Sequence, residues 1–303
     1  MERPLTPPHG QRRSLAARAG DRFVLRAGSR VGTVGGGIVA DPLAARRARR
    51  WPVGRSPLER LELVLAEAGV DGVSLAQLPV RLGVAPVAIE NVVARLETAP
   101  LREAGRLYAS RVLQELGDRI VTEVSQFHRT HPLEPGMARQ LLRSRLGAPP
   151  EFVDRVLANR TADGELEIVG AVVRVARWSP SLDAVDNANA GAVLAELRRG
   201  WHEPPSAAEL TARFGPRTND LLRFLERRGD VVQISDGRYY LAEALRELID
   251  ALRSHMEAGK AYAPADLRDM LGSSRKYLIP FLEYCDRIGI TRRESEGRVW
   301  SGR

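Results

Sequence analysis

Cysteine, lysine and long apolar runs are all scarce in this sequence, and two of these shortages exclude whole classes of structure. The single cysteine, Cys285, excludes an internal disulfide framework and a cysteine-rich zinc site. No run approaches the roughly 18 consecutive apolar residues of a membrane helix, and the N-terminus lacks the apolar stretch of a secretory signal. We therefore expect a cytoplasmic protein, a monomer, with no membrane partner.

Catalytic motifs are also missing. The sequence has no G-x-x-x-x-G-K-[ST] phosphate loop and no recognisable set of nucleophile, base and orienting residue. The glycine run at 35–37 lacks the Gly-Lys-Ser/Thr of a phosphate cradle. It therefore predicts a tight strand crossing, a place where one strand passes close to another. His128 and His131 have helical spacing, but no further ligand is evident nearby and Pro132 ends the helix, which favours structural capping over zinc. We expect no catalytic residue, no metal and no cofactor in this chain.

Positive charge is concentrated near the N-terminus. The net charge is +8, and a basic balance points to nucleic acid. However, residues 1–55 hold twelve arginines and only three acidic residues, so the rest of the chain is nearly neutral. Lysine occurs only at Lys260 and Lys276. This preference for arginine over lysine reflects the composition of the genome, so the isoelectric point alone indicates little about function. Any surface for nucleic acid must therefore be local.

The N-terminal part predicts little independent structure. Residues 1–20 are rich in proline, glycine and arginine without periodicity, which indicates disorder. Alternating apolar residues predict a strand at 22–26 and a second one over 31–40. Two strands alone are marginal in water, so they indicate the last piece of something larger. The arginine run at 46–50 predicts a basic connector.

From Ser56 onward one pattern recurs roughly every 55–70 residues, which indicates an array of repeats. It consists of a helix, a short helix, an amphipathic helix and two short strands around a glycine turn. In the clearest copy, residues 181–242, Ser206 and Glu209 form a capping-box pair, and Asp236-Gly237 is a strong hairpin signal. Three helices and a hairpin are the plan of a winged helix, whose third helix and wing can meet nucleic acid.

The other copies follow the same order and complete a mostly helical α+β array of four winged-helix modules. They cover residues 56–110, 111–180 and 243–303. In the first, Ser74 and Gln77 predict another capping box. In the last, Ser274 is expected to cap a third helix that runs to about Ile288. We expect the modules to form an extended line in which neighbours contact in sequence order.

Three segments resemble the C-terminal region of the bacterial selenocysteine-specific translation elongation factor. Asp21–Pro42, DRFVLRAGSRVGTVGGGIVADP, is similar to the end of that family's third β-barrel domain. Phe127–Arg143, FHRTHPLEPGMARQLLR, resembles its second winged-helix domain. Ser273–Arg293, SSRKYLIPFLEYCDRIGITRR, resembles its last recognition helix and wing and is the most specific match. The resemblance implies that residues 21–55 are a β-barrel remnant plus a linker.

The resemblance also implies a function. The family delivers selenocysteinyl-tRNA to the ribosome through N-terminal GTPase and barrel domains, and its last winged helices grip a hairpin in the messenger RNA, the selenocysteine insertion element, beside a UGA codon. An mRNA hairpin and the ribosome are thus the implied partners. GTP and magnesium belong to the full-length family, and the missing phosphate loop means that they and tRNA delivery do not carry over. We expect this chain to be the RNA-binding part of such a factor, without enzymatic activity. Met1 falls inside the expected third barrel, as in a fragment or a mis-assigned start.

The candidate RNA-binding residues lie in the last module. Four of them surround the start of its third helix, where backbone N–H groups and cations favour phosphate, and three lie on the wing: Ser273, Ser274, Arg275 and Lys276, then Arg292, Arg293 and Arg298. The major groove of an A-form stem is too deep and narrow for side chains to read. Recognition should therefore combine contacts to backbone phosphates with contacts to an unstacked base. The alternative is a plain N-cap followed by solvated charges.

Apolar residues of the same helix predict core rather than a base-stacking platform: Tyr277, Leu278, Phe281, Leu282 and Cys285. Two other functions remain open for the chain. Winged helices often read duplex DNA, although a DNA-binding regulator should have basic third helices in several modules. The nearly neutral first three modules also fit a protein-interaction array or a spacer. The connector Arg46–Arg50 fits a solvated linker or a contact with ribosomal RNA equally well.

Overall fold

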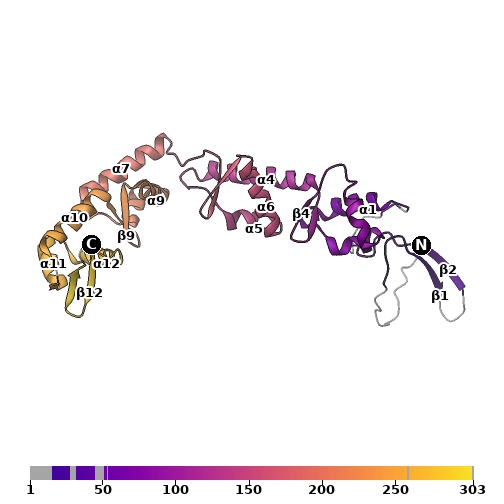
Figure 1. Ribbon diagram of the computed structural model, residues 1–303. Coiled ribbons are helices and arrows are strands. Elements are labelled where there is room, and N and C mark those ends of the chain that lie inside the picture. Colours follow the sequence, from indigo (N-terminus) through magenta and orange to yellow (C-terminus); the bar gives the residue numbers. More distant parts are fainter. Residues whose placement is uncertain (1–15, 28–31, 45–50, 53, 258, 302–303) are drawn as a thin grey trace. The chain divides into compact units, whose positions relative to one another are not determined.

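The computed structural model describes residues 16–27, 32–44, 51–52, 54–257 and 259–301, which are mostly helical with small antiparallel sheets (Figure 1). The chain divides into two compact units. The first contains residues up to 125 together with 138–176, and the second contains 126–137 together with 177–303. Among the described residues, no helix is long and apolar enough to cross a membrane.

The N-terminal hairpin consists of β1 (Arg22–Ala27) and β2 (Gly32–Ile38), which pair antiparallel. Phe23 lies opposite Gly37, and a Cβ on Gly37 would come within 2.7 Å of the Phe23 ring. The glycine run therefore makes room for a cross-strand ring and does not form a crossing. Apolar residues of the hairpin are exposed, with Val24 62% accessible, because two strands cannot bury a core.

The hairpin is fastened to the first group of helices through ordered contacts. Asp41, whose side chain is only 4% exposed, pairs with Arg81 at 2.5 Å. Ala19 is buried, and its N–H donates to the Val80 carbonyl at 3.0 Å. Residues 16–20, which we assigned to a disordered segment, are thus held by backbone hydrogen bonds and burial. Residues 1–15 and the connector at 46–50 lie outside the described residues.

The first group is built from three helices and a three-stranded sheet of order β3-β5-β4. Its elements are α1 (Pro57–Ala68), β3 (Val73–Ser74), α2 (Leu78–Leu82), α3 (Ile89–Val93), β4 (Leu101–Glu103) and β5 (Arg106–Tyr108), with 3-10 turns at Gly69–Asp71, Leu75–Gln77 and Pro86–Ala88. A capping box forms between Ser56 and Glu59. The one we predicted from Ser74 and Gln77 is absent: Ser74 makes no side-chain cap, because a 3-10 turn follows it.

The second group repeats this order with longer helices. Its elements are α4 (Ser110–Thr130), β6 (Met137–Ala138), α5 (Arg139–Leu146), α6 (Pro150–Ala162), β7 (Leu166–Val169) and β8 (Val172–Val175). Its α6 packs against β4 of the first group. The ring of Tyr108 stacks on that of Phe152 with centroids 4.0 Å apart, and Glu103 pairs with Arg155 at 3.5 Å. These two groups therefore share contacts within one compact unit.

The third group contains a helix trio and a two-stranded sheet. It has α7 (Ala184–Gly200), α8 (Ala207–Phe214), α9 (Thr218–Arg228), β9 (Val231–Ser235) and β10 (Arg238–Leu241). The predicted capping box of Ser206 and Glu209 is confirmed at the start of α8. The hairpin around Asp236-Gly237 is also confirmed, with Gly237 at φ +66°.

The fourth group is joined to the third by a common core. Its elements are α10 (Ala242–His255), β11 (Ala261–Tyr262), α11 (Pro264–Leu271), α12 (Arg275–Arg287), β12 (Thr291–Glu294) and β13 (Gly297–Trp300), and its sheet order is β11-β13-β12. Ile234 and Tyr240 from the third group are buried in the apolar cluster that contains Phe281 and Leu282. Arg287 donates to the Ile234 carbonyl at 3.0 Å. The two groups, which are neighbours in sequence, thus contribute buried residues to one apolar cluster.

Candidate nucleic-acid interface

The start of α12 falls where the sequence predicts it. Ser274 is the N-cap residue with extended backbone angles, and its carbonyl accepts from the Tyr277 and Leu278 N–H groups at 3.0 Å. The Ser274 hydroxyl makes no capping hydrogen bond, so the position of the cap is confirmed but its side chain is not used. Ser273 is buried at 7% exposure. The hydroxyl of Ser274 is therefore left for another partner.

A carboxylate of the third group lies at the same helix end. Glu203 Oε1 accepts from the Ser274 N–H at 2.9 Å. The free N–H groups of a first helical turn attract anions, and this carboxylate satisfies one of them from a position 71 residues away in sequence. Sequence reasoning missed Glu203 because nothing local links it to α12.

Two cations follow the cap on the first turn of α12. Arg275 and Lys276 are both exposed, and neither makes an ion pair with any described residue. The Lys276 ammonium lies 5.3 Å from the centroid of the Tyr277 ring, and the Arg238 guanidinium lies 4.6 Å from it. Cation–π contact of this kind adds a modest attraction and orients the side chains. Tyr277 thus acts as a half-buried support for cations and not as an open stacking surface.

Arg275 also borders a small hollow between α11 and α12. The hollow has a volume of about 200 Å³ and is lined by Pro264, Ala265, Arg268, Arg275, Leu278 and Ile279. Arg268 is exposed and pairs with its neighbour Asp269 at 2.7 Å. An arginine at the rim can stack on a base or bind guanine bidentately, while the apolar floor accepts the flat face of a base. Arg268 was not among our candidates, because only the packing of α11 on α12 brings it beside Arg275.

The wing presents two of the three predicted arginines. Arg292 and Arg293 are exposed; Arg292 pairs with Glu294 at 2.5 Å, whereas Arg293 has no ion pair among the described residues. Arg298 is different, because it is only 5% exposed and its Nε lies 2.9 Å from Asp286 Oδ2. The structure therefore does not bring Arg298 to the surface: it ties β13 to α12.

Four of the five residues predicted for the packed face of α12 are confirmed as core, whereas Tyr277 is only half-buried. Leu278, Phe281, Leu282 and Cys285 are at most 2% exposed. Burial raises the pKa of Cys285 to about 12, so this thiol stays protonated and unreactive near neutral pH. A rigid, fully packed helix is what holds the first-turn cations in place.

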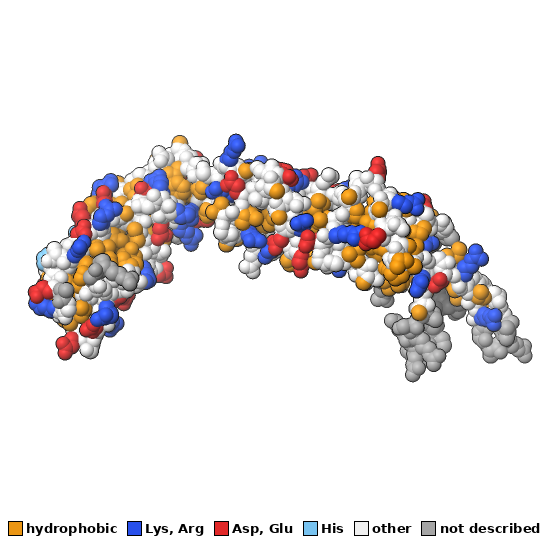
Figure 2. All heavy atoms as spheres, in the orientation of Figure 1, with side chains coloured by type: hydrophobic (Ala, Val, Ile, Leu, Met, Phe, Trp, Pro, Cys, Tyr) orange, Lys and Arg blue, Asp and Glu red, His pale blue; other side chains and the backbone are white. Residues whose placement is uncertain are grey.

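The third helices of two other groups use their arginines for internal contacts. Arg160 of α6 pairs with Asp118 and Glu165 at 2.6 and 2.7 Å. Arg227 of α9 donates to the Leu133 carbonyl and lies 3.9 Å from Glu134. On the face shown in Figure 2, cations and carboxylates alternate without a large field of one sign. The exposed cations on the first turn of α12 thus stand out from those of α6 and α9.

The two histidines that invited a zinc interpretation have aromatic contacts. His128 is 6% exposed and stacks on Trp178 with centroids 3.7 Å apart. His131 stacks on Phe127 at 4.4 Å. Among the residues that the structure describes, no group of three His, Cys, Asp or Glu side chains could hold a metal ion. His131 also directly follows the last residue of α4 and donates its N–H to the Phe127 carbonyl at 2.8 Å, so the pair combines ring stacking with the expected place at a helix end.

A helix–turn–helix followed by a β-hairpin places the chain among winged-helix proteins, and comparison with known families agrees. Residues 254–300 and residues 121–174 each match a family model described as "Elongation factor SelB, winged helix", the third and the second such domain respectively. These two segments of the chain are therefore similar to winged-helix domains of the SelB elongation factor.

Whole-chain comparisons agree with this assignment. The chain is 26% identical over 305 residues to the selenocysteine-specific elongation factor of Desulfomicrobium baculatum, covering 94% of this chain and 48% of that protein. It is 27% identical to the factor of Escherichia coli K12, covering 92% and 47%. The chain thus spans about half the length of the curated relatives it matches, in their C-terminal part.

One solved structure supports the fold. A crystal structure of a bacterial selenocysteine-specific elongation factor aligns over 94% of this chain and 45% of its own, with a TM-score of 0.52 and 21% identity. The mRNA-binding domain of SelB from E. coli in complex with SECIS RNA aligns over 37% of this chain at a TM-score of 0.32, which is too low to support an argument about this fold.

Proposed function

We propose that this chain binds a hairpin in messenger RNA through the start of α12 and thereby directs selenocysteine incorporation at a UGA codon. The relatives named above are selenocysteine-specific elongation factors. The observation that carries the proposal is the pair Arg275 and Lys276, exposed and unpaired with described carboxylates on a rigid helix.

The binding mechanism combines phosphate attraction with recognition of one base. Arg275 and Lys276 meet the backbone of the stem, and the unused Ser274 hydroxyl donates to a phosphate oxygen. An unstacked base of the loop or a bulge enters the hollow bordered by Arg268 and Arg275. Arg293 extends the contact along the wing. Arg298 is left out of this surface because Asp286 occupies its guanidinium.

The architecture that we propose for this task has four winged-helix modules, one for each helix-and-sheet group, after a hairpin that is the remnant of a β-barrel. The chain's own part in translation is then RNA binding without catalysis. GTP, magnesium, selenocysteinyl-tRNA and the ribosome are proposed partners of the complete factor, and the chain is proposed to act as a cytoplasmic monomer. This sequence contains no G-x-x-x-x-G-K-[ST] motif that would bind GTP.

The first prediction tests the site with paired substitutions in the full chain. Arg275→Ala combined with Lys276→Ala should weaken hairpin binding about 10- to 100-fold and flatten the dependence of log affinity on log salt, because two phosphate contacts are lost. The measurement is fluorescence anisotropy with a labelled hairpin of a selenocysteine insertion element across a salt series. The matched control is Arg246→Ala with Arg253→Ala, which removes two exposed cations from α10.

An equal loss in the control pair would show that general charge, not the α12 site, drives binding. Competition by duplex DNA as strong as that by the unlabelled hairpin would favour a DNA-binding regulator. Micromolar, saturable binding of GTP with magnesium by this chain would contradict its assignment as a part without nucleotide binding.

A further inference from the structure

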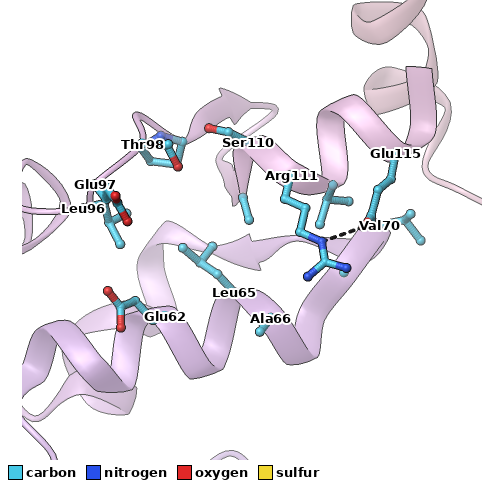
Figure 3. A pocket seen from close by; sticks show the side chains of 14 residues that line it. Glu62, Leu65, Ala66, Val70, Leu96, Glu97, Thr98, Ser110, Arg111 and Glu115 are labelled. Atoms are coloured by element: carbon cyan, nitrogen blue, oxygen red, sulfur yellow. Dashed lines mark hydrogen bonds and ion pairs between the residues drawn. The ribbon is translucent and has the colours of Figure 1, made fainter. Parts of the chain in front are cut away.

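The first group contains a pocket that is far from α12 in sequence. Its lining also differs from the start of α12 in the kinds of residue that it contains. We call it the α1 pocket; it has a volume of about 470 Å³ and is formed by α1, the segment after α3 and the first turns of α4. Figure 3 shows it from close by, with Leu65 of α1 pointing into its middle. Its size falls in the range of pockets that accept ligands or peptide side chains.

One end of the α1 pocket carries unbalanced negative charge. Glu62 from α1 and Glu97 from the segment after α3 lie at the same end in Figure 3. Both are exposed, and neither makes an ion pair or a side-chain hydrogen bond with any described residue. At the other end Arg111 is already paired with Glu115 at 2.6 Å. The three carboxylates and one guanidinium of the lining therefore leave two acidic groups without a cation.

The floor between these ends is apolar. It is formed by Leu65, Ala66, Val70, Leu96, Pro100, Ala109 and Val112. Leu65 is only 4% exposed, so it belongs to the core of the group and gives the pocket a rigid base. Phosphates would meet the carboxylates of Glu62 and Glu97, which disfavours RNA here. A partner for this pocket needs an apolar side chain for the floor and a cation for the acidic end.

We propose that the α1 pocket docks a cationic peptide segment of a partner protein. A Lys or Arg of the segment lies between Glu62 and Glu97, and a leucine-sized side chain covers Leu65. Charge complementarity selects this occupant, because the mouth offers carboxylates that nothing described neutralises. The α1 pocket thus gives the first group a protein-binding function. This function is separate from RNA recognition by α12 and does not depend on it.

The test uses two labelled synthetic peptides and the full chain. In one peptide arginines alternate with leucines, and in the other glutamates replace the arginines. We expect saturable binding of the arginine peptide alone, with affinity that falls as salt screens the carboxylates. Glu62→Gln combined with Glu97→Gln should weaken it about tenfold, which corresponds to ~1.4 kcal/mol. Ala66→Trp, an exposed position on α1, should fill the floor and weaken it as well.

The matched control is Glu151→Gln with Glu283→Gln, which removes two exposed carboxylates outside the pocket and should leave peptide binding unchanged. Thermal unfolding of each variant confirms that the group is intact. Equal binding of the glutamate peptide, no saturable binding of the arginine peptide, or full affinity in the Glu62/Glu97 variant would each overturn the proposal. Weaker binding of labelled hairpin RNA by the Ala66→Trp variant would assign the pocket to RNA instead.

Discussion

At the scale of single residues, the function that we propose for α12 depends on which charges are already paired. Arg298 and Arg293 stand opposite each other on adjacent strands, yet Arg298 is buried against Asp286 and Arg293 is exposed. A buried arginine that has a carboxylate partner stabilises the fold and is not available to a ligand. The same argument applies to Glu203, whose carboxylate occupies a helix end that would otherwise attract phosphate.

The prediction at this scale concerns Glu203. Glu203→Gln keeps an acceptor for the Ser274 N–H but removes the negative charge, so hairpin affinity should rise about fivefold. The matched control is Glu283→Gln, an exposed carboxylate further along α12. Anisotropy titrations at low salt give both values. Weaker hairpin binding by Glu203→Gln would mean that the carboxylate positions α12 for RNA and does not compete with it.

At the scale of elements, close packing decides the effect of a helical glycine. Gly117 lies in α4, where alanine would normally stabilise by about 1 kcal/mol. A Cβ at this position, however, would collide with the guanidinium of Arg160. That guanidinium is held by Asp118, Glu165 and the Gln114 carbonyl, so it cannot move without losing these partners. Gly191 in α7 has nothing within 4 Å of its missing Cβ.

We therefore expect opposite signs for two equivalent substitutions. Gly117→Ala should lower the free energy of unfolding by about 1 kcal/mol, because lost ion pairs outweigh helix propensity. Gly191→Ala should raise it by about 1 kcal/mol. Urea denaturation of each variant measures both. In an Arg160→Ala background the collision is gone, so Gly117→Ala should become stabilising; a stabilising effect in the wild-type background would refute the packing argument.

At the scale of the molecule, groups combine into larger cores. Within each compact unit the hairpin of one group packs on the third helix of the next: β4 against α6, and β9 against α12. Tyr108 and Tyr240 contribute fully buried rings, the first stacked on Phe152 and the second in the cluster around Phe281. Helix α12 is therefore supported by residues of the preceding group.

This predicts shared unfolding of the third and fourth groups. Tyr240→Ala should cost about 3–5 kcal/mol, and it should increase amide exchange in α9 and in α12 together, because β9, which pairs with the strand of Tyr240, packs against both helices. Tyr108→Ala is the matched control, with its effect expected in α1 and α6, because its strand contacts α1 and its ring stacks on Phe152. Hydrogen exchange followed by mass spectrometry resolves these segments. Faster exchange in α9 alone, with α12 unchanged, would show that the two groups unfold separately.

The sequence by itself determined the order and type of most elements. Capping at Ser206 and Glu209, the Asp236-Gly237 hairpin and the apolar face of α12 are local patterns, and each one is reproduced in the structure. Such features follow from hydrogen bonds and side-chain spacing within a few residues, so a linear sequence is enough to predict them. The start of α12 at Ser274 was predicted for the same reason.

Only the tertiary structure decided which charges are paired and which are available. It buried Arg298 against Asp286, placed Glu203 at the start of α12, set Arg268 beside Arg275, and left Glu62 and Glu97 together at one pocket. Glu203 and Ser274 are 71 residues apart in sequence, and no local rule relates them. Pairing of charges depends on distances of a few ångströms between elements, and those distances are fixed by how the helices and hairpins pack.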